Sequence, residues 1–108
     1  RLTDWAKLLE DEGLVRLSTY HGKSSLVLLP RLVADNVGLA TIYNDPSGVS
    51  LQFWRSVFER KAPNSLEPVE KLLAKRIGQG SSTREISDEL LNALTVAYRE
   101  AARGKIDA

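Results

Sequence analysis

Residues 19–25, TYHGKSS, gather the side chains best suited to bind phosphate. They include His21, the only histidine of the chain, with a glycine, a lysine and two serines. The Gly-Lys-Ser end matches the end of a phosphate-binding loop, but such a loop has a second glycine five residues before Gly22, where Leu17 stands. A strand pattern also follows where the helix that holds the phosphate would begin. We therefore interpret this segment as a bend between two strands.

His21 also lacks the sequence context of a catalytic or metal-binding residue. A catalytic histidine acts with a nucleophile and an orienting acid, and no serine here lies in a Gly-x-Ser-x-Gly turn. With one histidine and no cysteine, only carboxylates remain as metal ligands. We predict a protein without catalytic residues, metal or cofactor.

An enzymatic alternative comes from residues 56–61, SVFERK. Glu59 and Lys61 form a Glu-x-Lys triplet there, and Asp45 lies fourteen residues upstream at a predicted strand end. The pattern resembles PD-(D/E)xK nucleases, in which two carboxylates hold a divalent ion and the lysine polarises water or phosphate. The resemblance implies metal-dependent cleavage by Asp45, Glu59 and Lys61. It departs from the family because Asp45 precedes Pro46, the reverse of the Pro-Asp order.

The segment WAKLLEDEGLVRLSTYHGKSSLVLLP carries a second resemblance, which extends over residues 3–30. It is similar to the last helix and wing of winged-helix domains, which run helix, Gly-Leu-Val, strand, basic turn, strand. The resemblance implies that His21 and Lys23 at the turn, and Arg16 on the strand before it, contact the phosphates or minor groove of DNA. Arg31 completes the predicted nucleic-acid-binding set. The two helices that precede the wing in that family have no counterpart here.

Composition limits these possibilities without choosing among them. The 108 residues predict one domain, and 43% apolar with 27% charged residues is typical of a globular chain. Fifteen basic and fourteen acidic residues give a net charge of +1, so nucleic-acid binding would depend on where a few cations lie. No apolar run is long enough for a membrane span, and no signal peptide is seen. We expect a cytoplasmic piece of a longer protein, because methionine is absent and the chain starts at Arg1.

The apolar pattern predicts an α+β fold. A helix over residues 3–12, capped by Thr3 and ended by Gly13, precedes four period-2 segments at residues 14–20, 26–29, 37–43 and 49–53. These segments predict an antiparallel meander of three to four strands. Residues 54–61 fit a helix or a strand equally well. A helix from Asn64 or Ser65 to Gly78, a linker over residues 78–83 and a last helix ending at Gly104 complete the prediction of one helix before the sheet and two after it.

One core should unite these elements, formed among others by Trp5, Leu28, Leu39, Leu72 and Leu94. On the last helix, Leu91 and Tyr98 widen the apolar stripe, either as more core or as a contact with another chain. We therefore predict a non-enzymatic module of a larger protein that binds nucleic acid through its phosphates. A protein-interaction or dimerisation domain is the alternative, and the nuclease is the third class.

Overall fold

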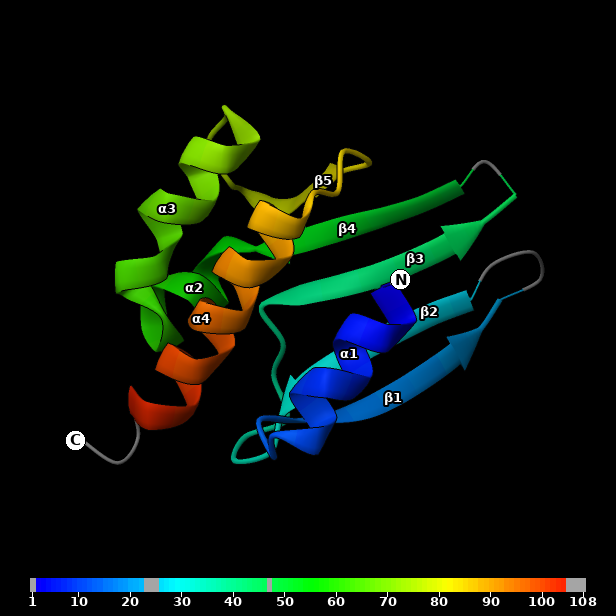
Figure 1. Ribbon diagram of the computed structural model, residues 1–108, viewed down its shortest axis with the longest axis horizontal. Helices are drawn as coiled ribbons and strands as arrows, with labels where there is room; N and C mark the ends of the chain where they lie inside the picture. Colours follow the sequence, from blue (N-terminus) through cyan, green and yellow to red (C-terminus); the bar gives the residue numbers. More distant parts are fainter. Residues whose placement is uncertain (1, 23–25, 47, 105–108) are drawn as a thin grey trace.

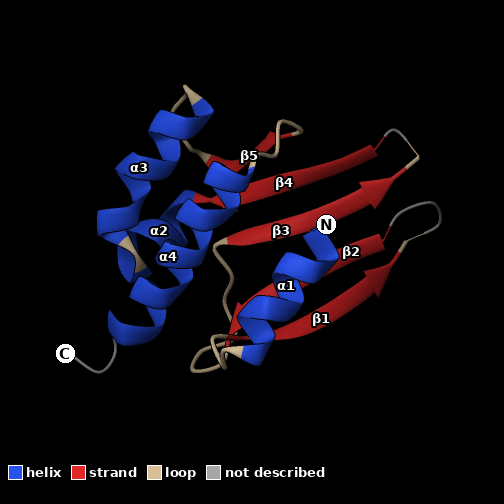
Figure 2. Cartoon of the chain, viewed as in Figure 1, coloured by secondary structure: helices blue, strands red, loops and turns tan. Residues whose placement is uncertain are grey.

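The computed structural model describes residues 2–22, 26–46 and 48–104. The described residues form four helices and five strands, with β1 to β4 following one another without a helix between them (Figures 1 and 2). In order they are α1 (Leu2–Asp11), β1 (Val15–His21), β2 (Leu26–Leu32), β3 (Ala40–Asp45), β4 (Gly48–Trp54), α2 (Arg55–Lys61), α3 (Pro63–Leu73), β5 (Gln79–Thr83) and α4 (Asp88–Gly104). The α+β class is confirmed.

The strands form one antiparallel sheet in the order β1-β2-β3-β4-β5. The four predicted strands are confirmed as neighbours. The predicted linker is wrong, because Gln79–Thr83 forms β5, a fifth strand that pairs with β4. Consequently two helices follow β4 and a third follows β5, one more than expected. No helix among the residues described is long and apolar enough to cross a membrane.

The two faces of the sheet differ in what covers them. Figure 1 shows α1 and α4 lying across one face, whereas α2 and α3 lie beyond the end of the sheet. Side chains alternate between the faces along each strand. Val15, Leu28 and Leu51 point to the face that the helices cover and are buried in the core. The intervening residues point to the other face, which we call the open face.

The core lies between the covered face and the helices. Helix α1 contributes Leu2, Trp5, Ala6 and Leu9, while Leu91 and Tyr98 of α4 are also buried in it. These two α4 residues therefore belong to the core and offer no surface to a second chain. Trp5, Leu28, Leu39 and Leu94 are core residues as predicted, but Leu72 is 47% exposed on α3. Its inclusion was wrong, because α3 packs on α4 beyond the end of the sheet and turns Leu72 to solvent.

Tyr98 closes a gap in the sheet between β2 and β3. Its hydroxyl donates to the carbonyl of Pro30 at 2.8 Å and accepts the N–H of Ala40 at 3.2 Å. Trp5 packs edge-on against the Tyr98 ring, with the centroids 6.2 Å apart. Burial raises the pKa of Tyr98, so the hydroxyl stays protonated and able to donate.

Helix boundaries depart from prediction where tertiary contacts override local signals. Thr3 was predicted to cap the first helix, but α1 already includes Leu2, so Thr3 lies within its first turn. Gly13 ends the helix with a φ of 77°, as predicted. Residues 55–61 are helical, which settles the ambiguous segment. Helix α3 stops at Leu73, not at Gly78, and Ala74 adopts the left-handed conformation with a φ of 56°. The chain turns early because the side chain of Ile77 enters the core and its N–H bonds the Glu70 carboxylate at 2.7 Å.

Candidate nucleic-acid interface

The open face brings together two of the four predicted nucleic-acid-binding residues. Arg16 on β1 and Arg31 on β2 are direct cross-strand partners. Arg16 is exposed and Arg31 is half-buried. Directly opposite residues have Cβ atoms about 5 Å apart, so the two guanidinium groups share one small surface.

The charge of this arginine pair is not neutralised nearby. Like charges directly opposite each other in a sheet are destabilising. Within the described part of the chain, no carboxylate forms an ion pair with Arg16 or Arg31. The one acidic strand residue on the open face, Asp45, lies at the far end of β3. The pair is therefore a local positive site on a nearly neutral molecule, suited to an anion.

The other two predicted residues do not join the pair. His21 ends β1 and is exposed, but it stands at an odd position, five residues from Arg16, and so points to the covered face. Lys23 lies outside the described residues. A ligand on the open face would reach His21 only by passing around the edge of β1.

Aromatic side chains share the open face with the arginines. Tyr20 of β1 and Tyr43 of β3 lie in one row across the sheet, with Val27 of β2 between them. Tyr20 is 64% exposed, whereas Val27 is 9% exposed. Large aromatic surface left in solvent beside cations is typical of faces that bind nucleic-acid bases.

The third aromatic residue, Trp54, borders a hollow next to the arginines. The hollow has a volume of about 260 Å³, and Arg31, Trp54, Leu29 and Thr41 line it together with residues 36–38 and Ala40. The loop that holds residues 36–38 crosses close to β2, since a Cβ at Gly38 would lie 2.8 Å from the Pro30 oxygen. The indole N–H of Trp54 donates to the Thr41 hydroxyl at 3.1 Å, which fixes the ring over the open face.

The structure does not bring the three nuclease candidates together. Asp45 lies at the hairpin end of β3 opposite Gly48, whereas Glu59 lies on α2, beyond the other end of β4. The seven residues of β4 span roughly 20 Å, far more than one ion can bridge. Glu59 pairs with Arg55, and Lys61 pairs with Asp35. Among the described residues, no three His, Cys, Asp or Glu side chains are grouped to hold a metal.

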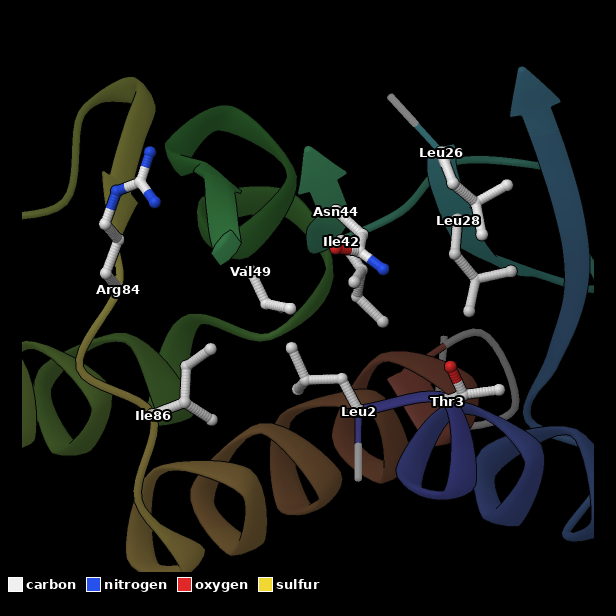
Figure 3. A pocket seen from close by; sticks show the side chains of 9 residues that line it. All are labelled: Leu2, Thr3, Leu26, Leu28, Ile42, Asn44, Val49, Arg84 and Ile86. Atoms are coloured by element: carbon white, nitrogen blue, oxygen red, sulfur yellow. The ribbon is translucent and has the colours of Figure 1, made fainter. Parts of the chain in front are cut away.

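A larger hollow, of about 390 Å³, lies on the covered face (Figure 3). Apolar side chains form most of its wall, and Leu2, Leu28 and Ile42 among them are core residues. Arg84 lies at one side of it, next to the β3–β4 hairpin. This hollow marks incomplete packing between the start of α1 and the hairpin end of the sheet.

Cations also gather at a groove between the start of α3 and the end of α4. Arg60, Lys61, Arg99 and Arg103 line it. Two of these four cations are already paired, Lys61 with Asp35 and Arg99 with Glu12 at 2.7 Å. The Glu100 carboxylate accepts from the N–H of Asn64 and the hydroxyl of Ser65, so an acid already occupies the start of α3. The open face is the better anion site because its arginines lack such partners in the described chain.

Sequence reasoning missed the aromatic part of the interface. Trp54 was placed in the ambiguous segment, and Tyr20 and Tyr43 were taken only as strand residues. The two-residue period of a strand could have found them in part. Arg16 and Tyr20 are four residues apart on one strand, so the period alone places both side chains on the same face, which Arg31 of the neighbouring strand shares. The register between strands, which the sequence does not give, was needed to place Trp54 beside Arg31.

The chain matches no protein-family model, no curated protein and no solved structure. The function proposed below therefore rests on the geometry of the open face.

Proposed function

We propose that this protein is a non-enzymatic module that binds nucleic acid on the open face of its sheet, mainly through phosphate. The observation that carries the proposal is the cross-strand pair of Arg16 and Arg31, two cations without a carboxylate partner in the described chain. The aromatic residues on the same face supply contact area for the rest of a nucleotide.

Phosphate is the anion that this arrangement favours. An arginine guanidinium binds phosphate oxygens in bidentate fashion, and it is weakly hydrated, so it releases water at low cost. Two guanidinium groups on neighbouring strands present donors to one phosphate or to consecutive phosphates. Bound phosphate would also relieve the repulsion between the two cations, which otherwise destabilises the sheet.

The hairpin between β1 and β2 remains part of the proposal. His21 at the end of β1, and Lys23, which lies outside the described residues, stay in the proposed set of phosphate contacts. Because phosphate contacts carry no sequence information, we expect little dependence on base sequence from these four residues.

The test is a titration of fluorescent single-stranded DNA and RNA, and of duplex DNA, at several salt concentrations. Arg16→Ala and Arg31→Ala should each weaken binding and lower the slope of log K against log salt by about one counterion. The loss should be similar for different base sequences, since phosphate is the group contacted.

Arg103→Ala is the matched control, because it removes the same charge from α4, beside the basic groove. We expect it to leave affinity and salt slope unchanged. The opposite result, with Arg103→Ala weakening binding and the two sheet variants behaving like the parent, would move the interface to the groove. Absence of binding at low salt would contradict nucleic-acid binding and favour a protein-interaction domain.

A further inference from the structure

We infer that the hollow bordered by Trp54 receives one unpaired base of a single-stranded nucleic acid. This inference rests on the proposed function, since Arg31, which lines the hollow, is one of the two phosphate contacts. It adds a substrate class, because phosphate contact alone does not separate single strands from duplexes.

Trp54 is held in place before any ligand binds. Its indole N–H donates to Thr41, whose side chain is buried with 4% exposure. A ring fixed in this way loses little conformational freedom when a base stacks on it. Preorganised contacts of this kind favour binding because less entropy is lost on association.

The size and chemistry of the hollow fit one aromatic ring system. Its volume of about 260 Å³ lies below the range of about 300–1,000 Å³ that is usual for drug-sized ligands. Leu29 and Val37 give its lining apolar side chains, and Asn36 and Arg31 add polar groups to it. A base needs this combination of apolar contact for its faces and hydrogen-bonding groups at its edges.

The rest of the open face favours a single strand over a duplex. Stacking requires the face of a base, which is covered by its neighbours within a duplex. Tyr20 and Tyr43 continue the aromatic surface toward the hairpin end, so further unpaired bases would find partners along it. The arginine pair lies beside the hollow, where it can contact the phosphates next to the inserted base.

The experiment compares an intact single-stranded oligonucleotide with a base-free chain of the same length and phosphate number, and with duplex DNA. The parent should bind the intact strand about 5- to 150-fold more tightly than the base-free chain, the range expected for one stacked base. Binding should also quench tryptophan fluorescence. Of the two tryptophans, Trp5 is 6% exposed in the core, so the quenching reports on Trp54.

Variants of Trp54 test whether this side chain stacks on the base. Trp54→Ala should remove the preference for the intact strand, and Trp54→Phe should keep part of it, with folding checked by circular dichroism. Equal affinity of the parent for both chains, without quenching, would overturn base insertion even if Trp54→Ala failed to fold. The phosphate contact would still stand in that case if Arg16→Ala weakened binding to both chains. No binding to any chain would overturn the proposed function and this inference together.

Discussion

The hydroxyl of Tyr98 is the clearest case of a single polar group that completes the fold. It replaces the missing ladder bonds between β2 and β3 by bridging Pro30 and Ala40, both buried. Pro30 itself has no N–H to donate, so the sheet needs an outside partner at this point. The sequence identified Tyr98 as part of an apolar stripe but gave no sign of this bond, because its partners are about sixty residues away.

Tyr98→Phe should therefore destabilise the protein, although it removes only the hydroxyl oxygen. It leaves a buried N–H and a buried carbonyl with fewer partners, which costs about 1–3 kcal/mol in the free energy of unfolding. Because burial raises the pKa of Tyr98 in the folded protein, the stabilisation by its hydroxyl is complete below the ordinary pKa of 10.0 and is lost as the pH rises through the folded pKa. The difference in free energy of unfolding between the parent and Tyr98→Phe should therefore shrink in alkaline solution.

Urea denaturation at several pH values measures both effects. Tyr20→Phe is the matched control, since Tyr20 is 64% exposed on the open face and its loss should change stability by less than about 0.5 kcal/mol. Equal stabilities of the two variants would show that the Tyr98 hydroxyl contributes nothing net.

At the scale of the elements, the ion pair of Arg55 and Glu70 holds α2, α3 and β5 together. Both side chains also form hydrogen bonds with the backbone of Ile77. Arg55 donates to the Glu70 carboxylate at 2.9 Å and to the Ile77 carbonyl at 2.8 Å. Glu70 accepts in turn from the Ile77 N–H. That backbone bond, aided by Arg55 and opposed by burial, lowers the pKa of Glu70 below its ordinary 4.5.

Glu70→Gln should cost about 1.5–3 kcal/mol at neutral pH, the usual range for hydrogen bonds to a charged group. Because the pKa of Glu70 is lower in the folded protein than in the unfolded chain, its carboxylate stabilises the fold fully above the unfolded pKa. This stabilisation disappears as the pH falls through the folded pKa. The difference between parent and variant should therefore narrow from about pH 5 downward. Glu67→Gln, which changes an exposed carboxylate that pairs with Lys71, is the control and should show neither effect. A difference that stayed constant down to pH 3 would rule out this role of Glu70.

The same junction explains why β5 was not predicted. Its residues, QGSST, lack the apolar alternation that marked the other strands, and Gly80 has a φ of 82°. The strand is held instead by pairing with β4, by the Gln52 side chain on the Gly80 carbonyl and by the Lys75 ammonium on the Ser82 carbonyl. Strands β1 to β4 were predictable because one face of each is apolar. The exclusion of Leu72 from the core and the pairing of Arg16 with Arg31 depend on packing and register that periodicity does not fix.

Across the whole molecule, the arginine pair and the covering helices lie on opposite sides of one sheet, whereas Trp54 and Val37 of the hollow also pack against the core. Helices α1 and α4 shield the covered face, and among the described residues no helix packs on the open face. With a net charge of only +1, the chain has little long-range attraction for nucleic acid. The open face therefore has to act through a few well-placed contacts. Its affinity should respond strongly to single substitutions there and weakly to charges elsewhere.

This layout also predicts how the domain unfolds. Leu28 is 8% exposed between the sheet and the helices, so Leu28→Ala should lower the free energy of unfolding by about 2–5 kcal/mol. Part of the Leu28 side chain already borders the hollow of Figure 3, which favours the lower end of that range. Leu72→Ala, the same substitution on the solvent side of α3, should cost less than about 1 kcal/mol.

Urea unfolding followed by tryptophan fluorescence and far-ultraviolet circular dichroism tests this contrast. Trp5 lies in the core and Trp54 on the open face, so the fluorescence reports on both sides of the sheet. Because one core joins the sheet to α1 and α4, the two signals should change together in a single transition, for the parent and for both variants. Equal costs of the two substitutions would contradict the placement of α3 outside the shared core. Separate transitions for the two signals would instead show that the helices and the sheet do not unfold as one unit.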